Sequence, residues 1–281
     1  MTAHVDTTAS QESDLLQLHH ALQAHLEHLL PAGQQADRVR AAMRAGTLAP
    51  GKRIRPLLLL LAARDMGCDV AQQGILDLAC AVEMVHAASL ILDDIPSMDN
   101  ARMRRGRPAI HCEYGENVAI LAAVALLSRA FEVIALAPGL PPTHKAEAIA
   151  ELSSAVGLQG LVQGQFQDLH DGAHSRSPEA ITLTNELKTS VLFRATLQMA
   201  AIAADASVQV RQRLSYFAQD LGQAFQLLDD LADGSKHTGK DCHQDQGKST
   251  LVQMLGPEGA ERRLRDHLSS ADAHLACACH R

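Results

Sequence analysis

The chain has 281 residues, 47% of them apolar and 20% charged, so it can bury a sizeable core and is not intrinsically disordered. Its 32 acidic residues outnumber the 25 Lys and Arg residues, giving a formal charge of −7. This balance argues against a general nucleic-acid binder, which needs excess positive charge on its surface. Five Phe, two Tyr and no Trp are too few aromatic residues for a stacking surface that binds single strands.

Residues 1–11 are polar and are expected to form a flexible N-terminus, followed by a single domain over residues 12–281. They contain no apolar stretch of the kind found in secretory signals. The conspicuous apolar run from Leu57 to Ala63 is much shorter than the ~20 residues that a membrane span needs, so no transmembrane segment is expected. The cysteines are scattered, which indicates reduced thiols and a cytoplasmic location.

Apolar residues follow helical spacing nearly everywhere, and the short alternating runs typical of strands are not seen. An all-α protein is therefore predicted. The expected helices span residues 12–30, 34–44, 52–66, 71–95, 116–137, 144–170, 178–204, 207–232 and 257–276. The stretches 76–95 and 214–231 are apolar on most faces, which predicts that both lie at the centre of a helical bundle.

Both of these apolar helices end in aspartate clusters. The clusters are Asp93, Asp94 and Asp99, and Asp229, Asp230 and Asp233. Carboxylates this close repel each other, and the negative end of a helix dipole adds to the cost of desolvating them. A cluster taken alone could be a solvated helix end. Two clusters on apolar helices favour facing walls that bind a hard cation such as Mg²⁺.

Basic residues flank the two acidic clusters. Lys52, Arg53 and Arg55 lie at a predicted helix start, where the helix dipole disfavours cations, so a bound anion is the better explanation. Further cations follow the clusters: Arg102, Arg104, Arg105 and Arg107 after the first, and Lys236, Lys240 and Lys248 after the second. His86 lies two helical turns before Asp93; the alternative for it is a satisfied core histidine. Carboxylates, Mg²⁺ and a ring of cations are typical of a site for phosphate esters.

These segments resemble the trans-isoprenyl diphosphate synthases, and most of all the bacterial members that make geranylgeranyl diphosphate for carotenoid biosynthesis. The resemblance covers residues from about 35 to 256 and follows the family's order. It is carried by Gly51-Lys-Arg-Ile-Arg-Pro56, Asp93-Asp94-x-x-x-x-Asp99 with Arg104-Arg105-Gly106, Lys188-Thr189, Phe225-Gln226-x-x-Asp229-Asp230-x-x-Asp233 and Gly247-Lys248-Ser-Thr250. Ser190 departs from the pattern, because relatives commonly have Gly there. The resemblance implies a single-domain helical bundle around a central cavity, usually as a homodimer.

The resemblance also implies residue roles. About three Mg²⁺ ions would be bound by Asp93, Asp99, Asp229 and Asp233, with Asp94 and Asp230 in support. Isopentenyl diphosphate would bind Lys52, Arg55, His86 and Arg105, and the allylic diphosphate would bind Arg104, Lys188, Lys240 and Lys248. Lys188, Thr189 and Gln226 would act in catalysis, close to the allylic cation.

The implied reaction joins isopentenyl diphosphate to an allylic diphosphate, with loss of diphosphate and a proton. Geranylgeranyl diphosphate, made from farnesyl diphosphate, is the expected main product. The small residues Ala88 and Ser89, about one turn before Asp93, leave room for a long chain, and Met84 is expected to form a soft floor. A farnesyl diphosphate synthase, a class I terpene cyclase and a non-catalytic regulatory subunit remain open as alternatives.

Overall fold

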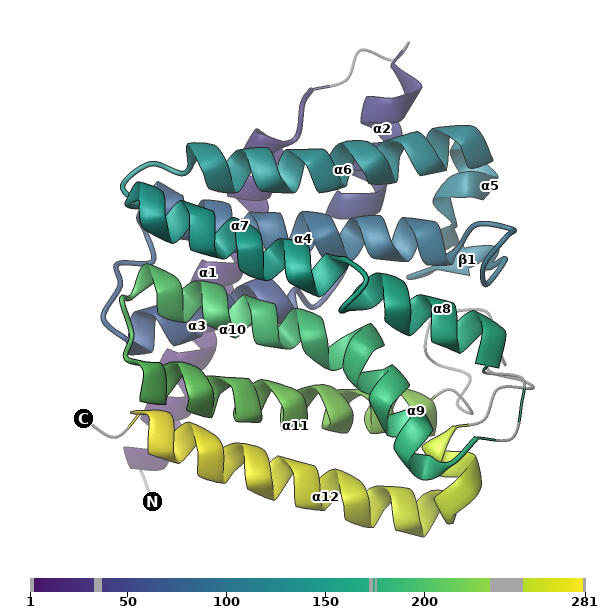
Figure 1. Ribbon diagram of the computed structural model, residues 1–281. Coiled ribbons are helices and arrows are strands. Elements are labelled where there is room, and N and C mark those ends of the chain that lie inside the picture. The colour runs from purple at the N-terminus through teal and green to yellow at the C-terminus, as the bar shows by residue number, and fades with distance from the viewer. Residues whose placement is uncertain (1–2, 33–36, 172–173, 175, 233–249, 280–281) are drawn as a thin grey trace.

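The computed structural model describes residues 3–32, 37–171, 174, 176–232 and 250–279 of the chain. It is a bundle of roughly stacked helices with one short hairpin at the edge (Figure 1). In chain order the elements are α1 (Ala3–Leu29), α2 (Arg38–Leu48), α3 (Ile54–Asp65), α4 (Gln73–Asp93), β1 (Met103–Arg104), β2 (Arg107–Pro108), α5 (Ile110–Tyr114), α6 (Glu116–Leu136), α7 (Pro142–Val156), α8 (Leu161–Asp171), α9 (Pro178–Asn185), the π-helix η1 (Glu186–Ser190), α10 (Val191–Ala203), α11 (Val208–Ala232) and α12 (Leu251–Cys279). The prediction of an all-α fold is confirmed.

Helix α4 lies inside the bundle because its sequence is apolar on nearly every face. Every residue from Leu78 to Val85 is buried. Helices α1, α2, α3, α6 and α10 all contact it. Since α4 ends at Asp93, the first aspartate cluster emerges where the buried core meets the end of the bundle.

Helix α11 is not apolar all round as predicted. Its buried face includes Leu214, Phe217 and Leu227, and it packs between α10 and α12. Leu228, on the other side, is 56% exposed, and Asp229 next to it is also exposed. The prediction overlooked the polar residues between the apolar ones, which turn one face of the helix towards solvent.

Two glycines divide the predicted helix over residues 144–170. Helix α7 ends at Val156 and α8 begins at Leu161, with Gly157 and Gly160 between them. A Cβ atom at Gly160 would lie 2.0 Å from the carbonyl oxygen of Ala155, so the backbone comes too close there for any side chain. The break allows α8 to leave the line of α7 and to approach the end of α4 (Figure 1).

A π-helix interrupts the predicted helix over residues 178–204. The wide turn η1 contains Lys188 and Thr189 and lies between α8 and α11. A Cβ atom at Gly164 of α8 would lie 2.5 Å from the Lys188 nitrogen, and one at Gly222 of α11 would lie 2.2 Å from the Ser190 hydroxyl. The wide π-helix therefore comes so close to α8 and α11 that both helices have glycine at the points of contact, where no side chain would fit.

The hairpin of β1 and β2 was not predicted. Met103 pairs with Pro108 and Arg104 with Arg107, and the two residues between them, Arg105 and Gly106, have positive φ angles of 53° and 74°. Two-residue hairpin turns require such angles, which Asn or Gly usually supply. Because Arg105 occupies the first turn position, the sequence lacks the Asn-Gly or Gly-Gly pair that would have predicted the hairpin.

The ends of the chain also differ from expectation. Helix α1 begins at Ala3, whereas the first helix was predicted to begin at residue 12; the flexible N-terminus over residues 1–11 and the domain boundary at residue 12 stay predictions. Helix α12 is interrupted at Gly256, whose backbone is non-helical with a φ angle of 70°. The part after this break begins at Pro257, as predicted, and runs to Cys279, beyond the predicted end; the turn from Leu251 before the break was not predicted. Helix α5 lies in a segment for which no helix was predicted.

Two helices, α4 and α6, are long and apolar enough to cross a membrane. In α4, 72% of the apolar window is buried inside the protein, which is the property of a core helix. In α6 the buried share is only 44%, and Leu121 and Val124 are more than half exposed. The outer face of α6 is therefore apolar surface that the described part of the chain does not cover.

Candidate active site

A cavity of about 470 Å³ lies where the ends of several elements meet: α4, the start of α3, the hairpin, η1 and the last turns of α11. Most of the predicted site residues line it. These residues are Lys52, Arg55, His86, Ser89, Asp93, Asp99, Arg104, Arg105, Lys188, Thr189, Gln226 and Asp229. Asp93 and Asp229, which belong to different helices, therefore face a common space, as a site with two acidic walls requires.

Some predicted residues are not among those that line this cavity. Ala88 and Met84 are fully buried in the core, whereas their neighbour Ser89 reaches the cavity wall. Asp233, Lys240 and Lys248 lie outside the described residues. Asp94 points away from the main cavity and contributes to a smaller one of about 170 Å³ behind the hairpin.

Asp93 is a carboxylate that its surroundings perturb strongly. Burial raises its pKa to about 6, and the nearby charges of Asp99 and Asp94 act in the same direction, while Lys188 and Arg104 oppose them. The Asp99 backbone folds back, and its N–H donates to the Asp93 carbonyl at 2.9 Å. A half-buried carboxylate in this position gains from any bound cation that restores its charge.

Lys188 is the cation that faces this acidic wall. Its Nζ donates to Asp168 Oδ2 of α8 at 2.7 Å. Burial alone would lower the pKa of Lys188, but the carboxylates of Asp168, Asp93 and Asp99 outweigh burial and raise it. Lys188 therefore stays charged in the cavity. Asp168 was missed because it is a single acid in an otherwise unremarked helix, and its partner is twenty residues away.

A chain of hydrogen bonds connects η1 with the second aspartate cluster. The Thr189 hydroxyl donates to Gln226 Oε1 at 2.9 Å, and Gln226 Nε2 donates to Asp230 Oδ1 at 2.7 Å. The Gln226 amide is thereby fixed in one orientation. Thr189 and Gln226, both predicted as catalytic residues, thus form one connected group on the cavity wall.

Arg104 extends from the hairpin and forms a forked ion pair with Asp94. Its Nε lies 3.0 Å from Asp94 Oδ1, and its Nη2 contacts the same oxygen. Asp94 is buried, and burial raises its pKa although Arg104 opposes the shift. This pair fastens the hairpin to the end of α4 and holds Arg104 at the rim of the cavity.

Opposite the aspartates the cavity is basic. The Arg55 guanidinium lies 4.4 Å above the ring of Phe193 and 5.7 Å from that of Phe225, in cation–π geometry. Its buried Nε has no hydrogen-bond partner, and burial lowers its pKa to about 10, with Glu83 opposing and Arg105 reinforcing the shift. A buried, charged guanidinium with an unused donor is prepared for an anion.

His86 is uncharged on this basic wall. Burial is the largest cause that lowers its pKa well below the usual value, and Arg55, Arg105 and Arg104 lower it further. Arg105 Nη2 lies 3.4 Å from His86 Nε2. Because a guanidinium can only donate, Nε2 accepts, and the ring proton is on Nδ1.

The carboxylates fit a hard cation that is shared with a ligand. In the described part of the chain, no group of three His, Cys, Asp or Glu side chains is arranged to hold a metal ion by itself. Asp93, Asp99 and Asp229 nevertheless offer oxygen atoms to one cavity from two sides. Oxygen donors of this kind suit Mg²⁺, which usually keeps waters and takes further oxygens from substrate phosphates.

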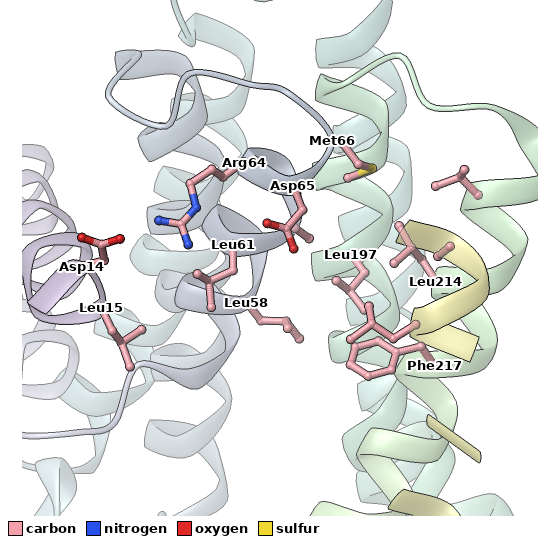
Figure 2. A pocket seen from close by; sticks show the side chains of 14 residues that line it. Asp14, Leu15, Leu58, Leu61, Arg64, Asp65, Met66, Leu197, Leu214 and Phe217 are labelled. Atoms are coloured by element: carbon pink, nitrogen blue, oxygen red, sulfur yellow. The ribbon is translucent and has the colours of Figure 1, made fainter. Parts of the chain in front are cut away.

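A second cavity, of about 490 Å³, lies at the other end of α3. Leu58, Leu197 and Phe217 line it, and Asp14 and Arg64 stand at its sides (Figure 2). Its lining is mostly apolar and does not include the predicted site residues described above. The charged residues that were predicted for the site are thus concentrated in the first cavity.

Comparison with known proteins identifies the family. The model of the polyprenyl synthetase family matches residues 36–276, and the chain belongs to this family. The chain is 62% identical to a geranylgeranyl diphosphate synthase of Pantoea ananas, over 98% of this chain and 90% of that one. It is 57% identical to a geranylgeranyl diphosphate synthase of Pseudescherichia vulneris, over 91% and 83% of the two chains.

Solved structures agree with this assignment. A geranyltransferase of Helicobacter pylori, complexed with magnesium and isoprenyl diphosphate, superposes with a TM-score of 0.86. It is 29% identical to this chain, and the match covers 94% of this chain and 90% of that one. Members of the family depend on Mg²⁺ in general.

We expect Asp93→Asn to stabilise the metal-free protein at neutral pH. The pKa of Asp93 in the folded protein, about 6, lies above its ordinary value of 3.8, so the folded state loses stability as pH rises between these values. Removing the carboxylate should increase the free energy of unfolding by up to about 3 kcal/mol above pH 7, relative to the difference below pH 4, because each pKa unit is worth about 1.4 kcal/mol.

Urea unfolding in a chelator between pH 4 and pH 8 measures this effect. The exposed residue Asp171 provides the control, because Asp171→Asn should leave the pH dependence of stability unchanged. A stability difference between Asp93→Asn and wild type that is the same at every pH would contradict the prediction.

Proposed function

We propose that this protein is a Mg²⁺-dependent geranylgeranyl diphosphate synthase, which condenses isopentenyl diphosphate with farnesyl diphosphate and releases diphosphate. One observation carries the proposal: a single cavity is acidic at Asp93, Asp99 and Asp229 and basic at Lys52, Arg55 and Arg105. Two diphosphates could bind there side by side, one through bridging cations and one directly. The names of the Pantoea and Pseudescherichia relatives support the same activity.

The acidic side is the proposed place for the allylic substrate. About three bound Mg²⁺ ions would neutralise the charge that develops on the departing diphosphate. Lys188, held by Asp168, and Arg104, held by Asp94, would donate to the diphosphate oxygens. Because both cations are already held by carboxylates, little reorganisation is needed when the charge builds up.

The cation that remains on the allylic carbon needs partial negative charge nearby. Thr189 and Gln226 line the cavity, and their mutual hydrogen bond orients the amide. We propose that the oxygen atoms of these two side chains stabilise the allylic cation until the double bond of isopentenyl diphosphate attacks it. The leaving diphosphate would then take up the proton that is lost. The protein supplies position and electrostatics, and no covalent intermediate is needed.

The basic side is the proposed place for isopentenyl diphosphate. Arg55 has a buried donor without a partner, and the neutral His86 offers an Nδ1 proton. Lys52 and Arg105 add positive charge from two further elements. A terpene cyclase acts on one diphosphate and has no use for a second anion site, so this wall favours condensation over cyclisation.

The apolar chain of the product would extend from Asp93 along α4, towards Ser89. At this level Leu161 of α8 and Leu192 of α10 also line the cavity. Ser89 is the only one of the three predicted chain-length residues that the described cavity reaches, so it replaces Ala88 as the site for testing product length.

We further propose that the protein acts as a homodimer through the outer face of α6. Ile120, Leu121 and Val124 form an exposed apolar strip there, with exposed fractions of 38%, 54% and 56%. Continuous apolar surface of this kind is typical of protein contacts. The largely buried α4, together with the free thiols of Cys68, Cys80, Cys112 and Cys277, supports our further proposal that the protein has no transmembrane segment and acts in the cytoplasm.

The purified protein should convert farnesyl and isopentenyl diphosphates into geranylgeranyl diphosphate when Mg²⁺ is present. Chromatography of the products, with dimethylallyl, geranyl and farnesyl diphosphates as separate starters, measures the activity and the preferred starter. A chelator should abolish turnover, and Mg²⁺ should restore it. Consumption of an allylic diphosphate without any requirement for isopentenyl diphosphate would indicate a cyclase and refute the proposal.

Ser89→Phe should shorten the main product to farnesyl diphosphate, because a ring at this wall occupies the space of the last isoprene unit. Ser89→Ala is the matched control. It removes the hydrogen bond from the Ser89 hydroxyl to the His86 carbonyl without adding volume, and it should keep the wild-type product. Unchanged product length in Ser89→Phe would mean that the chain grows elsewhere.

The double variant Leu121→Glu/Val124→Glu should be monomeric, since it places two charges in the proposed interface. Sedimentation velocity compares it with wild type and with Val208→Glu, which alters an apolar residue at the start of α11 that is more exposed, at 77%. Dimers that survive the double substitution would exclude the α6 face as the contact.

A further inference from the structure

The residue between the two proposed ligands Lys52 and Arg55 has an unusual conformation. Arg53 adopts a left-handed backbone with a φ angle of 50° and lies at the N-cap of α3. Non-glycine residues are held in this region only when their surroundings stabilise it. Arg53 is also only 4% exposed, which is rare for an arginine unless it is paired.

Three hydrogen bonds hold the Arg53 side chain. Nη1 donates to Glu83 Oε1 at 2.5 Å, while Nη2 donates to the Ala49 carbonyl at 2.8 Å and to Gln23 Oε1 at 3.3 Å. The bond to Ala49 closes the turn that contains Gly51 and Lys52 back on itself. The bond to Glu83 fastens the same turn to α4. A planar guanidinium can make both contacts at once, which an ammonium group cannot do as rigidly.

Glu83 also lies one helical turn before His86 on α4. It is 2% exposed, and it lines the cavity together with Arg53, Arg55 and Arg105. Burial, together with neighbouring arginines, lowers the pKa values of Arg55 and Arg105, and the negative charge of Glu83 opposes this shift. Glu83 therefore offsets like-charge repulsion within the basic wall, and at the same time it fixes the turn that carries Lys52.

We propose that Glu83 is a positioning residue for the anion site: through Arg53 it sets the place of Lys52 and Arg55 and so determines the affinity for isopentenyl diphosphate. The inference rests on the proposed function and adds to it a residue that acts through Arg53. Glu83 is a carboxylate on the basic side of the cavity, yet it belongs to the machinery that binds an anion.

The contrast with Asp77 makes the proposal testable. Asp77 is a second buried acid on α4, 3% exposed, and its Oδ1 lies 2.6 Å from His25 Nε2. It does not line the cavity. Glu83→Gln and Asp77→Asn are therefore matched changes. Each replaces a buried carboxyl group of α4 that contacts one other side chain, and only the Glu83 contact adjoins the basic wall.

Steady-state kinetics with both substrates varied should distinguish the two variants. In Glu83→Gln the KM for isopentenyl diphosphate should rise about tenfold or more, because the released arginine no longer holds the turn, whereas the KM for the allylic diphosphate should change less than about twofold. Asp77→Asn should lower the melting temperature and leave both KM values unchanged. Equal effects of Glu83→Gln on both KM values, or no effect on either, would overturn the proposal.

Arg53→Lys tests the same contact if Glu83→Gln fails to fold. It keeps the charge but cannot reach Glu83 and Ala49 together, so the KM for isopentenyl diphosphate should again rise selectively, to a smaller extent. A wild-type protein that does not condense the two substrates would refute the proposed function. A wild-type protein that condenses them, with variants that show no selective change in KM, would refute only the role of Glu83.

Discussion

The repulsion among carboxylates at the ends of apolar helices is the constraint on which the rest of this structure depends. A bundle core can deliver Asp93 to a half-buried position only if other charges keep the cost tolerable. Lys188 from η1 and Arg104 from the hairpin supply part of that compensation, and each is itself held by an acid, Asp168 or Asp94. The negative charge that these cations leave uncompensated attracts further cations. A Mg²⁺-dependent enzyme requires this attraction.

The cavity separates its charges, so that two similar anions could be treated differently. On one side aspartates face Lys188, which suits a diphosphate that arrives with metal ions. On the other side Arg55 is stacked on Phe193 and lies close to Arg105 and a neutral His86, which suits a diphosphate bound directly. The arrangement would make one diphosphate a leaving group while the other stays attached. Glu83, paired with Arg53, places a negative charge on this basic side.

The helical class and most of the site could be predicted from the sequence, because helical spacing and charged clusters are local patterns. Asp93, Lys188 and Gln226 were recognised from short motifs, and the structure brings them to one cavity. Features that depend on distant partners were missed. The π-helix needs Gly164 and Gly222 on other helices, Asp168 matters only through Lys188, and the turn at Arg105 is set by the pairing of the hairpin. Ala88 and Ser89 were both predicted to leave room for the product from their spacing along α4, but only packing decides that Ser89 lies at the described cavity wall.

The wide turn η1 also limits how this chain can vary. It contains one residue more than a regular helix would use over the same length, and α9 and α10 continue on either side of it. Deleting Glu186 or Leu187 would remove the extra residue and let the segment close into an ordinary α-helix, so that the side chains within it would point in other directions. The contacts of Lys188 with Asp168 and of Thr189 with Gln226 would then be disturbed, without a single functional side chain having been replaced. Substitutions are therefore far easier to accommodate in this segment than a change in its length.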